Sequence, residues 1–228
     1  MAQLPWNKIE TVLLDMDGTL LDLHYDSYFW LEHLPAHLAK RDNKQLEAVR
    51  SEMHKTLKEM QGSLEWYCLD YWAERLQLDI MAVKREIDHL IAFRPDTQPF
   101  LDALKESGRE VVLVTNAHPD GLSLKIEKTQ LDDHIDTLIS THQFGVTKES
   151  QVLWQKLHAY LGFDKRHTLF VDDSQAILDA AKAFGIEYTL GISNPDSKAP
   201  HNNIVGHTAI TEYMSLLPSI KRDLYRAK

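Results

Sequence analysis

The sequence predicts an α/β fold, a doubly wound parallel sheet with an inserted α-helical cap domain. Short apolar runs that do not alternate with polar residues indicate strands buried on both faces, as in parallel sheets. Segments with helical periodicity separate these runs, which is the order expected for a doubly wound sheet. One long region, from about Leu21 to Phe93, lacks a convincing strand and contains helical patterns alone, which indicates an insertion.

Five segments are predicted as strands, because each is a short and nearly continuous run of apolar and β-branched residues. They are Thr11–Asp15, Glu110–Thr115, Ile135–Ser140, Thr168–Asp172 and Glu187–Leu190. The residues between them are expected to form helices that cover the sheet and complete a Rossmann-like core.

Helix-start and helix-stop signals place two of these helices. A helix that begins near Thr97 has Pro99 in its first turn and is closed by Gly108. The segment Ser174–Phe184 gathers its apolar residues on one face, and Gly185 lies just past its end. One helix therefore precedes the second strand, and the other follows the fourth.

The inserted region is expected to form a helical domain. An aromatic-rich helix is predicted over Glu65–Leu78. An earlier helix is indicated by apolar residues at helical spacing: Leu46, Val49, Met53, Leu57 and Met60. Ligands bind at the carboxyl ends of parallel strands, so an insertion that leaves the first strand would lie over such a site. We therefore expect a core domain of residues 1–20 and 94–228 and a cap domain of residues 21–93.

Composition and charge exclude several classes of function. The chain has 228 residues, of which 43% are hydrophobic and 26% charged, as in an ordinary globular protein. Its net charge of −9 argues against a broad attraction to nucleic acid or anionic lipid. No apolar run approaches the ~20 residues of a membrane span, and the N-terminus lacks a signal-peptide pattern. We therefore expect a cytoplasmic protein that acts on a small molecule, with neither nucleic acid nor membrane as a partner.

Cysteine and histidine content bears on metal binding. Cys68 is the single cysteine, so the chain cannot form an internal disulfide, which fits a reducing compartment. For the same reason we expect no metal site built on thiolates. Twelve histidines are present, but no pair shows zinc-binding spacing together with a third ligand. Among them, His118 is expected to cap the helix that follows Asn116 or to contact substrate.

Polar side chains gather where the predicted strands end. Asp15 and Asp17, one residue apart, follow the first strand. Because the carboxyl ends of parallel strands share one edge, five further polar residues are expected beside them: Thr115, Asn116, Lys148, Asp172 and Asp173. Like charges a few ångströms apart repel by several kcal/mol at an effective dielectric of ~20, and a divalent cation with oxygen ligands offsets that repulsion. The pattern therefore predicts Mg²⁺ at this edge.

Each of these groups suits phosphoryl transfer. Asp15 can attack phosphorus to form an acyl phosphate, and Asp17 can protonate the leaving alcohol and later deprotonate water. Asp15, Asp172 and the backbone carbonyl of Asp17 would hold Mg²⁺, while Asp173 would orient those ligands. The residues expected to bind phosphate oxygens and stabilise the transition-state charge are Thr115, Asn116 and Lys148.

Taken in order, these motifs resemble those of the haloacid dehalogenase superfamily. They are Asp15-Met-Asp-Gly-Thr, Thr115, Lys148 and Asp172-Asp173. The resemblance implies a Mg²⁺-dependent phosphatase that works through an aspartyl-phosphate, with a helical insertion of the C1 cap type. Asp17 favours a phosphate ester over an organohalide, because an alkoxide leaving group needs a proton and a halide does not.

Several segments resemble, more narrowly, the bacterial nucleotidases that hydrolyse GMP and IMP: residues 15–23, 66–72, 115–119 and 190–197. This likeness implies a purine nucleoside monophosphate as substrate, which no residue pattern shows independently. Three alternatives stay open: a phosphatase for another small ester such as a sugar phosphate or phosphoglycolate, a phosphomutase, and a binding domain without catalysis. The aromatic residues within 66–72 either pack in the cap or stack on a purine.

Overall fold

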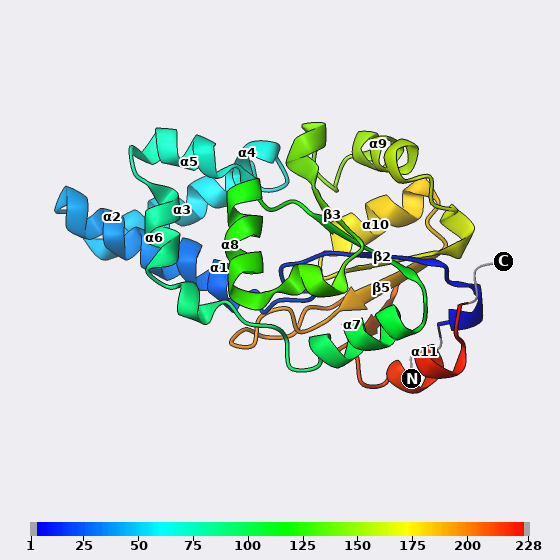
Figure 1. The fold of residues 1–228 in the computed structure, drawn as a ribbon. Helices are drawn as coiled ribbons and strands as arrows, with labels where there is room; N and C mark the ends of the chain where they lie inside the picture. Colours follow the sequence, from blue (N-terminus) through cyan, green and yellow to red (C-terminus); the bar gives the residue numbers. More distant parts are fainter. Residues whose placement is uncertain (1–3, 226–228) are drawn as a thin grey trace.

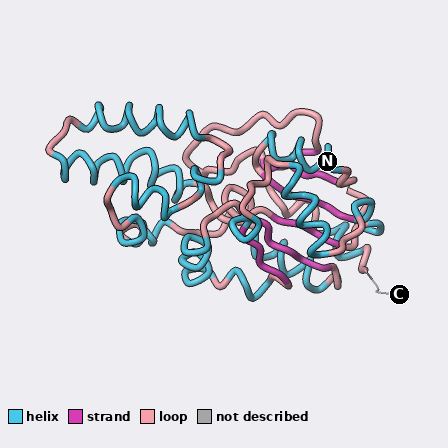
Figure 2. Tube along the Cα trace, turned by 90° about the horizontal axis from the view of Figure 1, so that it is seen from above, coloured by secondary structure: helices cyan, strands magenta, loops and turns pink. Residues whose placement is uncertain are grey.

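The computed structural model describes residues 4–225, so residues 1–3 and 226–228, at the two ends of the predicted core domain, lie outside the described part. Within it, six parallel strands form one sheet in the order β3-β2-β1-β4-β5-β6. Their bounds are β1 Thr11–Leu14, β2 Glu110–Thr115, β3 Thr137–Ser140, β4 Thr168–Asp172, β5 Tyr188–Ile192 and β6 Thr208–Ile210. Figure 2 shows the strands side by side, away from the helical insertion.

Alternate residues of the central strand are buried on opposite faces of the sheet. Val12 and Leu14 belong to one apolar cluster, whereas Leu13 belongs to another. The first cluster includes side chains of α7 (Thr97–Glu106), α8 (Pro119–Thr129) and α11 (Leu217–Arg222), and the second those of α9 (Gln151–Leu161) and α10 (Gln175–Phe184). Figure 1 shows α7 and α11 on one side of the sheet and α9 and α10 on the other. The doubly wound parallel fold predicted from non-alternating apolar runs is confirmed.

Between β1 and β2 the chain forms a helical insertion, as the sequence predicts. Its helices are α1 (His24–Tyr28), a π-helical segment (Phe29–His33), α2 (Leu34–Asp42), α3 (Leu46–Met60), α4 (Leu64–Tyr67), α5 (Leu69–Leu76) and α6 (Ile80–Arg85). Their apolar side chains form a cluster of their own, to which α8 contributes Leu124. Leu21 and Phe93 form an antiparallel bridge, so the two connections to the core run together. Figure 1 shows these helices grouped at one end of the molecule, beside α8.

Local predictions differ from the structure at several points, and the first strand ends at Leu14 instead of Asp15. The helix expected over Glu65–Leu78 is interrupted at Cys68, whose ψ of 108° is extended, so α4 and α5 are separate. The third strand begins at Thr137 instead of Ile135, and the fifth continues to Ile192. The sequence did not predict β6, because two of its three residues are exposed and it therefore shows no apolar run.

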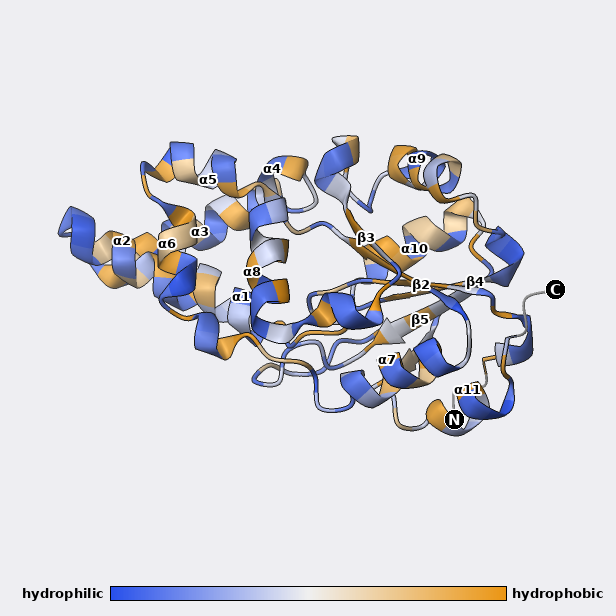
Figure 3. Ribbon diagram, viewed as in Figure 1, coloured by the Kyte–Doolittle hydropathy of each residue, from blue (hydrophilic) through white to orange (hydrophobic). Residues whose placement is uncertain are grey.

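Helices of the insertion have one buried and one exposed face. Figure 3 shows hydrophilic and hydrophobic stretches on α2, α3, α5 and α6, as expected for helices that pack on one side only. Among the described helices, none is both long and apolar enough to cross a membrane. Short 3₁₀ helices occur at Trp6–Lys8, Asp88–Leu90, Leu131–His134, Thr141–Phe144 and Lys165–His167.

Candidate active site

The ends of β1 and β4 bring two carboxylates together. Leu14 is paired with Val171 in the register of the sheet, so the next residues, Asp15 and Asp172, are neighbours at its carboxyl edge. The backbone N–H of Asp15 donates to the carbonyl oxygen of Val171 at 3.0 Å and keeps this residue aligned with β4. Both side chains are buried, with Asp15 only 6% and Asp172 0% exposed.

Lys148 joins these two carboxylates. Its Nζ donates to Oδ1 of Asp15 at 2.5 Å and to Oδ2 of Asp172 at 2.7 Å. The hydroxyl of Thr19 donates to the other oxygen of Asp15, Oδ2, at 3.0 Å. Burial alone would lower the pKa of Lys148, but the charges of the two carboxylates outweigh it and raise that pKa. The lysine therefore stays charged, and both oxygens of Asp15 are held in a fixed orientation.

Asp173, which is partly exposed, completes an acidic cluster with the buried Asp15 and Asp172. One carboxylate oxygen from each of Asp15, Asp172 and Asp173 lies within 4.8 Å of the others. Burial raises the pKa of Asp15 to about 6, an effect that Lys148 opposes and Asp172 reinforces. Burial, with the charges of Asp172 and Asp15, also raises the pKa of Asp173 well above its usual value. Three carboxylates against one ammonium leave a formal charge of −2, which oxygen-liganded Mg²⁺ fits in both charge and chemistry.

Asp17 lies in a different environment. Its carboxylate does not belong to the acidic cluster but accepts a hydrogen bond from Nζ of Lys125 at 2.6 Å. Lys125 also donates to Asp26 of α1 at 2.5 Å, and Asp26 accepts from Lys84 of α6 at 3.0 Å. Burial raises the pKa of Asp17 to about 6, although Lys125 opposes the shift. A carboxyl group with that pKa can exchange a proton near neutral pH, as a general acid and base must.

Thr115 is the last residue of β2, Asn116 follows it, and the two side chains have different hydrogen-bond partners. The Oγ1 of Thr115 accepts from the N–H of Ala117 at 3.0 Å, which leaves its own hydroxyl proton free to donate to an anion. The Oδ1 of Asn116 accepts from the backbone N–H of Lys148 at 3.0 Å, and its Nδ2 donates to Glu149 at 3.1 Å. Asn116 thus positions the Lys148 segment, and its predicted contact with phosphate stays a prediction.

The structure therefore brings together most of the predicted site residues at one edge of the sheet. Asp15, Asp172, Asp173 and Lys148 form one contiguous group, while the carboxylate of Asp17 points to a second group. Residues that the sequence reasoning missed as partners are Thr19, Asp26, Lys84 and Lys125.

Lys125 left a recognisable signal in the sequence. On α8 it lies three and four residues after Leu122 and Gly121, and all three are buried. A lysine on the apolar face of a helix needs a buried anionic partner, because an isolated charge is costly to bury. Its position alone could have indicated a buried ion pair, although not which carboxylate completes it.

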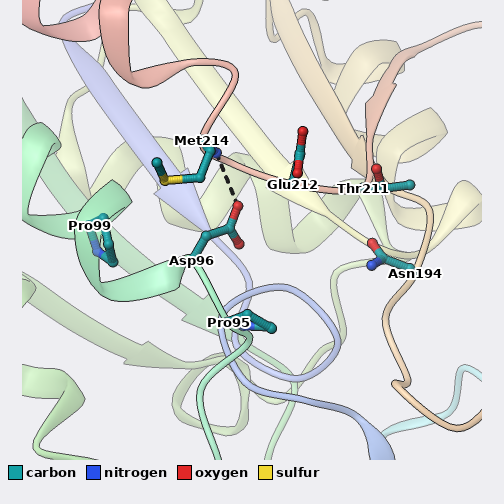
Figure 4. Close-up of a pocket in the computed structure, with 7 residues that line it drawn as sticks. All are labelled: Pro95, Asp96, Pro99, Asn194, Thr211, Glu212 and Met214. Atoms are coloured by element: carbon teal, nitrogen blue, oxygen red, sulfur yellow. Dashed lines mark hydrogen bonds between the residues drawn. The ribbon is translucent and has the colours of Figure 1, made fainter.

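A separate hollow near the start of α7 is not part of this site. It encloses about 440 Å³ and is lined by Pro95, Asp96, Pro99, Asn194, Thr211, Glu212 and Met214, none of them a predicted site residue. Figure 4 shows the carboxylate of Asp96 bonded to the N–H of Met214, at 3.0 Å. Its Oδ2 also accepts from the N–H of Tyr213. This acid is therefore committed to holding the segment before α11.

Fold and site together define a class of protein: a Rossmann-like α/β protein whose acidic side chains lie at the carboxyl ends of its central strands. Residues 9–185 match the family described as haloacid dehalogenase-like hydrolase. The sequence is also 46% identical, over 215 residues, to the GMP/IMP nucleotidase of Escherichia coli (strain K12), covering 94% of this chain and 97% of that protein. The chain belongs to the haloacid dehalogenase-like hydrolase family.

Solved structures of the family share the fold. A haloacid dehalogenase-type phosphatase from Thermococcus onnurineus is 20% identical, with a TM-score of 0.78 over 95% of this chain and 100% of that one. The L-2-haloacid dehalogenase of Xanthobacter autotrophicus is 16% identical, with a TM-score of 0.64 over 95% and 100% of the two chains. At these identities the likeness establishes architecture alone, and it agrees with a parallel core that carries a helical insertion.

Proposed function

We propose that this protein is a Mg²⁺-dependent 5′-nucleotidase that hydrolyses purine nucleoside monophosphates, GMP and IMP, through an aspartyl-phosphate on Asp15. The observation that carries the proposal is the group of three carboxylates, two of them buried, beside a single ammonium, with Asp15 fixed through both oxygens. The substrate is supported by the 46% identity to a GMP/IMP nucleotidase over nearly the whole of both chains.

In the first half-reaction a carboxylate oxygen of Asp15 attacks phosphorus, and the bond from phosphorus to the ester oxygen breaks. Burial raises the pKa of Asp17 to about 6, so a fraction of the molecules carries the protonated acid near neutral pH. In that form Asp17 gives its proton to the departing alkoxide, and the nucleoside leaves as an alcohol. Lys148 and the free hydroxyl proton of Thr115 face the charge that develops on the phosphoryl oxygens.

In the second half-reaction Asp17, now a carboxylate, takes a proton from water. The resulting hydroxide attacks phosphorus, the bond from phosphorus to the Asp15 oxygen breaks, and inorganic phosphate leaves. Asp15 and Asp172, with the backbone carbonyl of Asp17 and with Asp173 beside them, would hold Mg²⁺. When bound, Mg²⁺ neutralises charge on the acids and polarises the phosphoryl group.

The insertion supplies the cap in this proposal. We take residues 21–93 as a cap domain that closes over the core and excludes bulk water from the acyl phosphate. Within the aromatic run, Trp66, Tyr71 and Trp72 pack into the insertion's own apolar cluster. The hydroxyl of Tyr67 instead donates to Glu149 at 3.0 Å, next to Lys148, which makes Tyr67 our candidate for contact with the nucleoside. The single cysteine of the chain is consistent with a reducing cytoplasm.

A panel of phosphate esters tests the proposal. Initial rates of phosphate release give kcat/KM for purine and pyrimidine nucleoside monophosphates, phosphoglycolate and several sugar phosphates. GMP and IMP are expected to give the highest values. If a sugar phosphate or phosphoglycolate gives the highest kcat/KM, that ester is the substrate and the assignment to GMP and IMP is wrong. Conversion of a sugar phosphate to its isomer without release of phosphate would indicate a phosphomutase.

A further inference from the structure

Three metal-ligating side chains meet outside the acidic cluster. The Sγ of Cys68 and one ring nitrogen each of His118 and His142 lie within 4.8 Å of one another. The two imidazole rings are 5.1 Å apart between centroids and cross at 80°, so they present different edges to the space beside the thiol. These side chains come from three segments that are far apart in sequence.

The fold explains this convergence. Cys68 lies at the break between α4 and α5, where its extended ψ of 108° ends one helix before the next begins. His118 and His142 follow β2 and β3, which pair in parallel with Thr115 opposite Ser140, so the loops after the two strands lie side by side. The insertion therefore supplies the thiol, and the core supplies both imidazoles.

Two carboxylates flank His118. Oδ2 of Asp70, on α5, lies 3.3 Å from its Nε2, and Oδ2 of Asp120 lies 3.7 Å from its Nδ1. As predicted, His118 caps α8, because Nδ1 accepts from the N–H of Asp120 at 3.3 Å. Transfer of the ring proton from Nε2 to Nδ1 would end this cap bond, direct the proton to the Asp120 carboxylate and free the Nε2 lone pair for a metal. Such carboxylate–histidine pairs orient imidazoles bound to metals.

His142 has an unsatisfied nitrogen. Its Nε2 is buried and finds no hydrogen-bond partner within residues 4–225. Burial, together with the neighbouring His118, lowers the pKa of His142, so the ring is neutral at pH 7 and a lone pair is available. A buried polar atom without a partner costs about 1–3 kcal/mol, and a metal ion would remove that cost.

We propose that Cys68, His118 and His142 form a second metal site, for a transition metal such as Zn²⁺. Thiolate and imidazole ligands suit Zn²⁺ and not Mg²⁺, which prefers an all-oxygen shell. On binding, the S–H bond of Cys68 breaks, a bond from sulfur to the metal forms, and the proton goes to solvent. The thiolate and the Asp70 carboxylate beside His118 together offset the charge of one divalent ion.

Occupancy of this site has a structural consequence. Cys68 and Asp70 belong to the insertion, whereas His118 and His142 belong to the core. A bound ion therefore cross-links the two parts and opposes their separation. In this proposal one thiolate joins ligands from other segments, an arrangement that the expectation of no thiolate-based metal site did not consider.

Co²⁺ titration of the purified full-length protein tests this site, with excess Mg²⁺ present to occupy the acidic cluster. A thiolate-to-cobalt charge-transfer band should appear, saturate at one equivalent and disappear when Zn²⁺ is added. Cys68→Ser should abolish the band, and His142→Gln should weaken Co²⁺ binding by about 10–100-fold. His54→Gln, the same substitution at an exposed position of α3, is the matched control and should bind Co²⁺ as the unsubstituted protein does.

Circular dichroism verifies that each variant is folded, and His142→Gln still decides the matter if Cys68→Ser does not fold. The proposal fails if one equivalent of Co²⁺ gives no thiolate band, or if His142→Gln and His54→Gln bind equally. Because the readout is absorption and not turnover, this outcome is independent of whether the protein hydrolyses nucleotides.

Discussion

Two buried ionic groups lie next to each other in this molecule, and they differ in charge balance. The acidic cluster sets Asp15, Asp172 and Asp173 against Lys148 alone, a formal charge of −3 + 1 = −2. The second group, here called the Lys125 network, alternates Asp17, Lys125, Asp26 and Lys84, a formal charge of −2 + 2 = 0. The first group needs a cation from outside, whereas the second is neutral as it stands.

The pKa shifts follow this difference in partners. In the Lys125 network burial would raise the pKa of Asp26, but the charges of Lys125 and Lys84 outweigh it and lower that pKa to about 2. In the acidic cluster burial prevails, and the pKa of Asp172 rises although Lys148 opposes it. Desolvation raises the pKa of both carboxylates, so the number of nearby ammonium groups decides the direction of the net shift. The unbalanced group is suited to bind a ligand, and the balanced group to hold Asp17 in place across the core and the insertion.

The largest expected effect comes from Asp15→Asn. This substitution keeps the shape of the side chain but removes the nucleophile, so phosphate release should fall by about 10⁴-fold or more, as when other covalent nucleophiles are removed. Initial rates with GMP measure the loss, and circular dichroism verifies the fold. Substantial turnover by a folded Asp15→Asn variant would falsify the covalent route.

Metal removal tests whether the acidic cluster depends on a cation. EDTA should stop turnover, and Mg²⁺ should restore it. In the metal-free protein the pKa of Asp15 is raised from 3.8 to about 6, so the folded state binds this proton more tightly than the unfolded state. The resulting stability is fully present below pH ~4 and is lost as the pH rises through about 6, with an upper limit of about 3 kcal/mol for Asp15.

Mg²⁺ binds the ionised carboxylate and should therefore remove most of that loss. Urea unfolding of EDTA-stripped protein at pH 5 and pH 7.5, with and without Mg²⁺, measures the difference. The two series differ only in the presence of Mg²⁺, so the difference between their pH dependences reports on the acidic cluster. If the free energy of unfolding depends on pH equally with and without Mg²⁺, no metal binds among Asp15, Asp172 and Asp173.

Lys125→Met tests the balanced group. It removes the cation that lowers the pKa of Asp17, so this pKa should rise and the alkaline limb of the kcat profile should move to higher pH. Breaking a buried ion pair should also cost about 3–5 kcal/mol of the free energy of unfolding.

Lys128→Met is the matched control on the same helix, because Lys128 is exposed and pairs with Asp88 at 3.3 Å. Lys128→Met should lower the free energy of unfolding by less than about 1 kcal/mol and leave the pH profile of kcat unchanged. If the alkaline limb of the kcat profile stays at the same pH in Lys125→Met, the titration of Asp17 does not determine that limb.

The same contrast marks how far the sequence alone could lead. Asp15, Thr115 and Asp172 were predictable as neighbours, because strand ends are visible as apolar runs and parallel strands align those ends. The pairing of Lys125 with Asp17 and Asp26 was not, since it depends on how α8 packs against both β1 and α1.

Convergence of Cys68 with His118 and His142 was equally out of reach. It depends on a helix break at Cys68, where the local pattern predicted a continuous helix, and on the docking of the insertion against the core. Local periodicity specifies elements, but contacts between distant segments arise only when those elements pack.

Gly18→Ala should have the smallest effect, and it sharpens the comparison at the point where the two groups meet. Gly18 follows Asp17 with a φ of +83°, and a Cβ there would lie 2.7 Å from Oδ2 of Asp173 and 2.8 Å from the Cβ of Pro195. The substitution therefore adds backbone strain of about 1–3 kcal/mol and also displaces the Asp173 carboxylate. Gly162→Ala separates these two costs, because Gly162 has a φ of +74° and nothing within 4 Å of the added Cβ. Both variants should lose stability in urea unfolding, but only Gly18→Ala should weaken the rescue of EDTA-stripped enzyme by Mg²⁺. An equal Mg²⁺ requirement in the two variants would show that the position of Asp173 does not matter to metal binding.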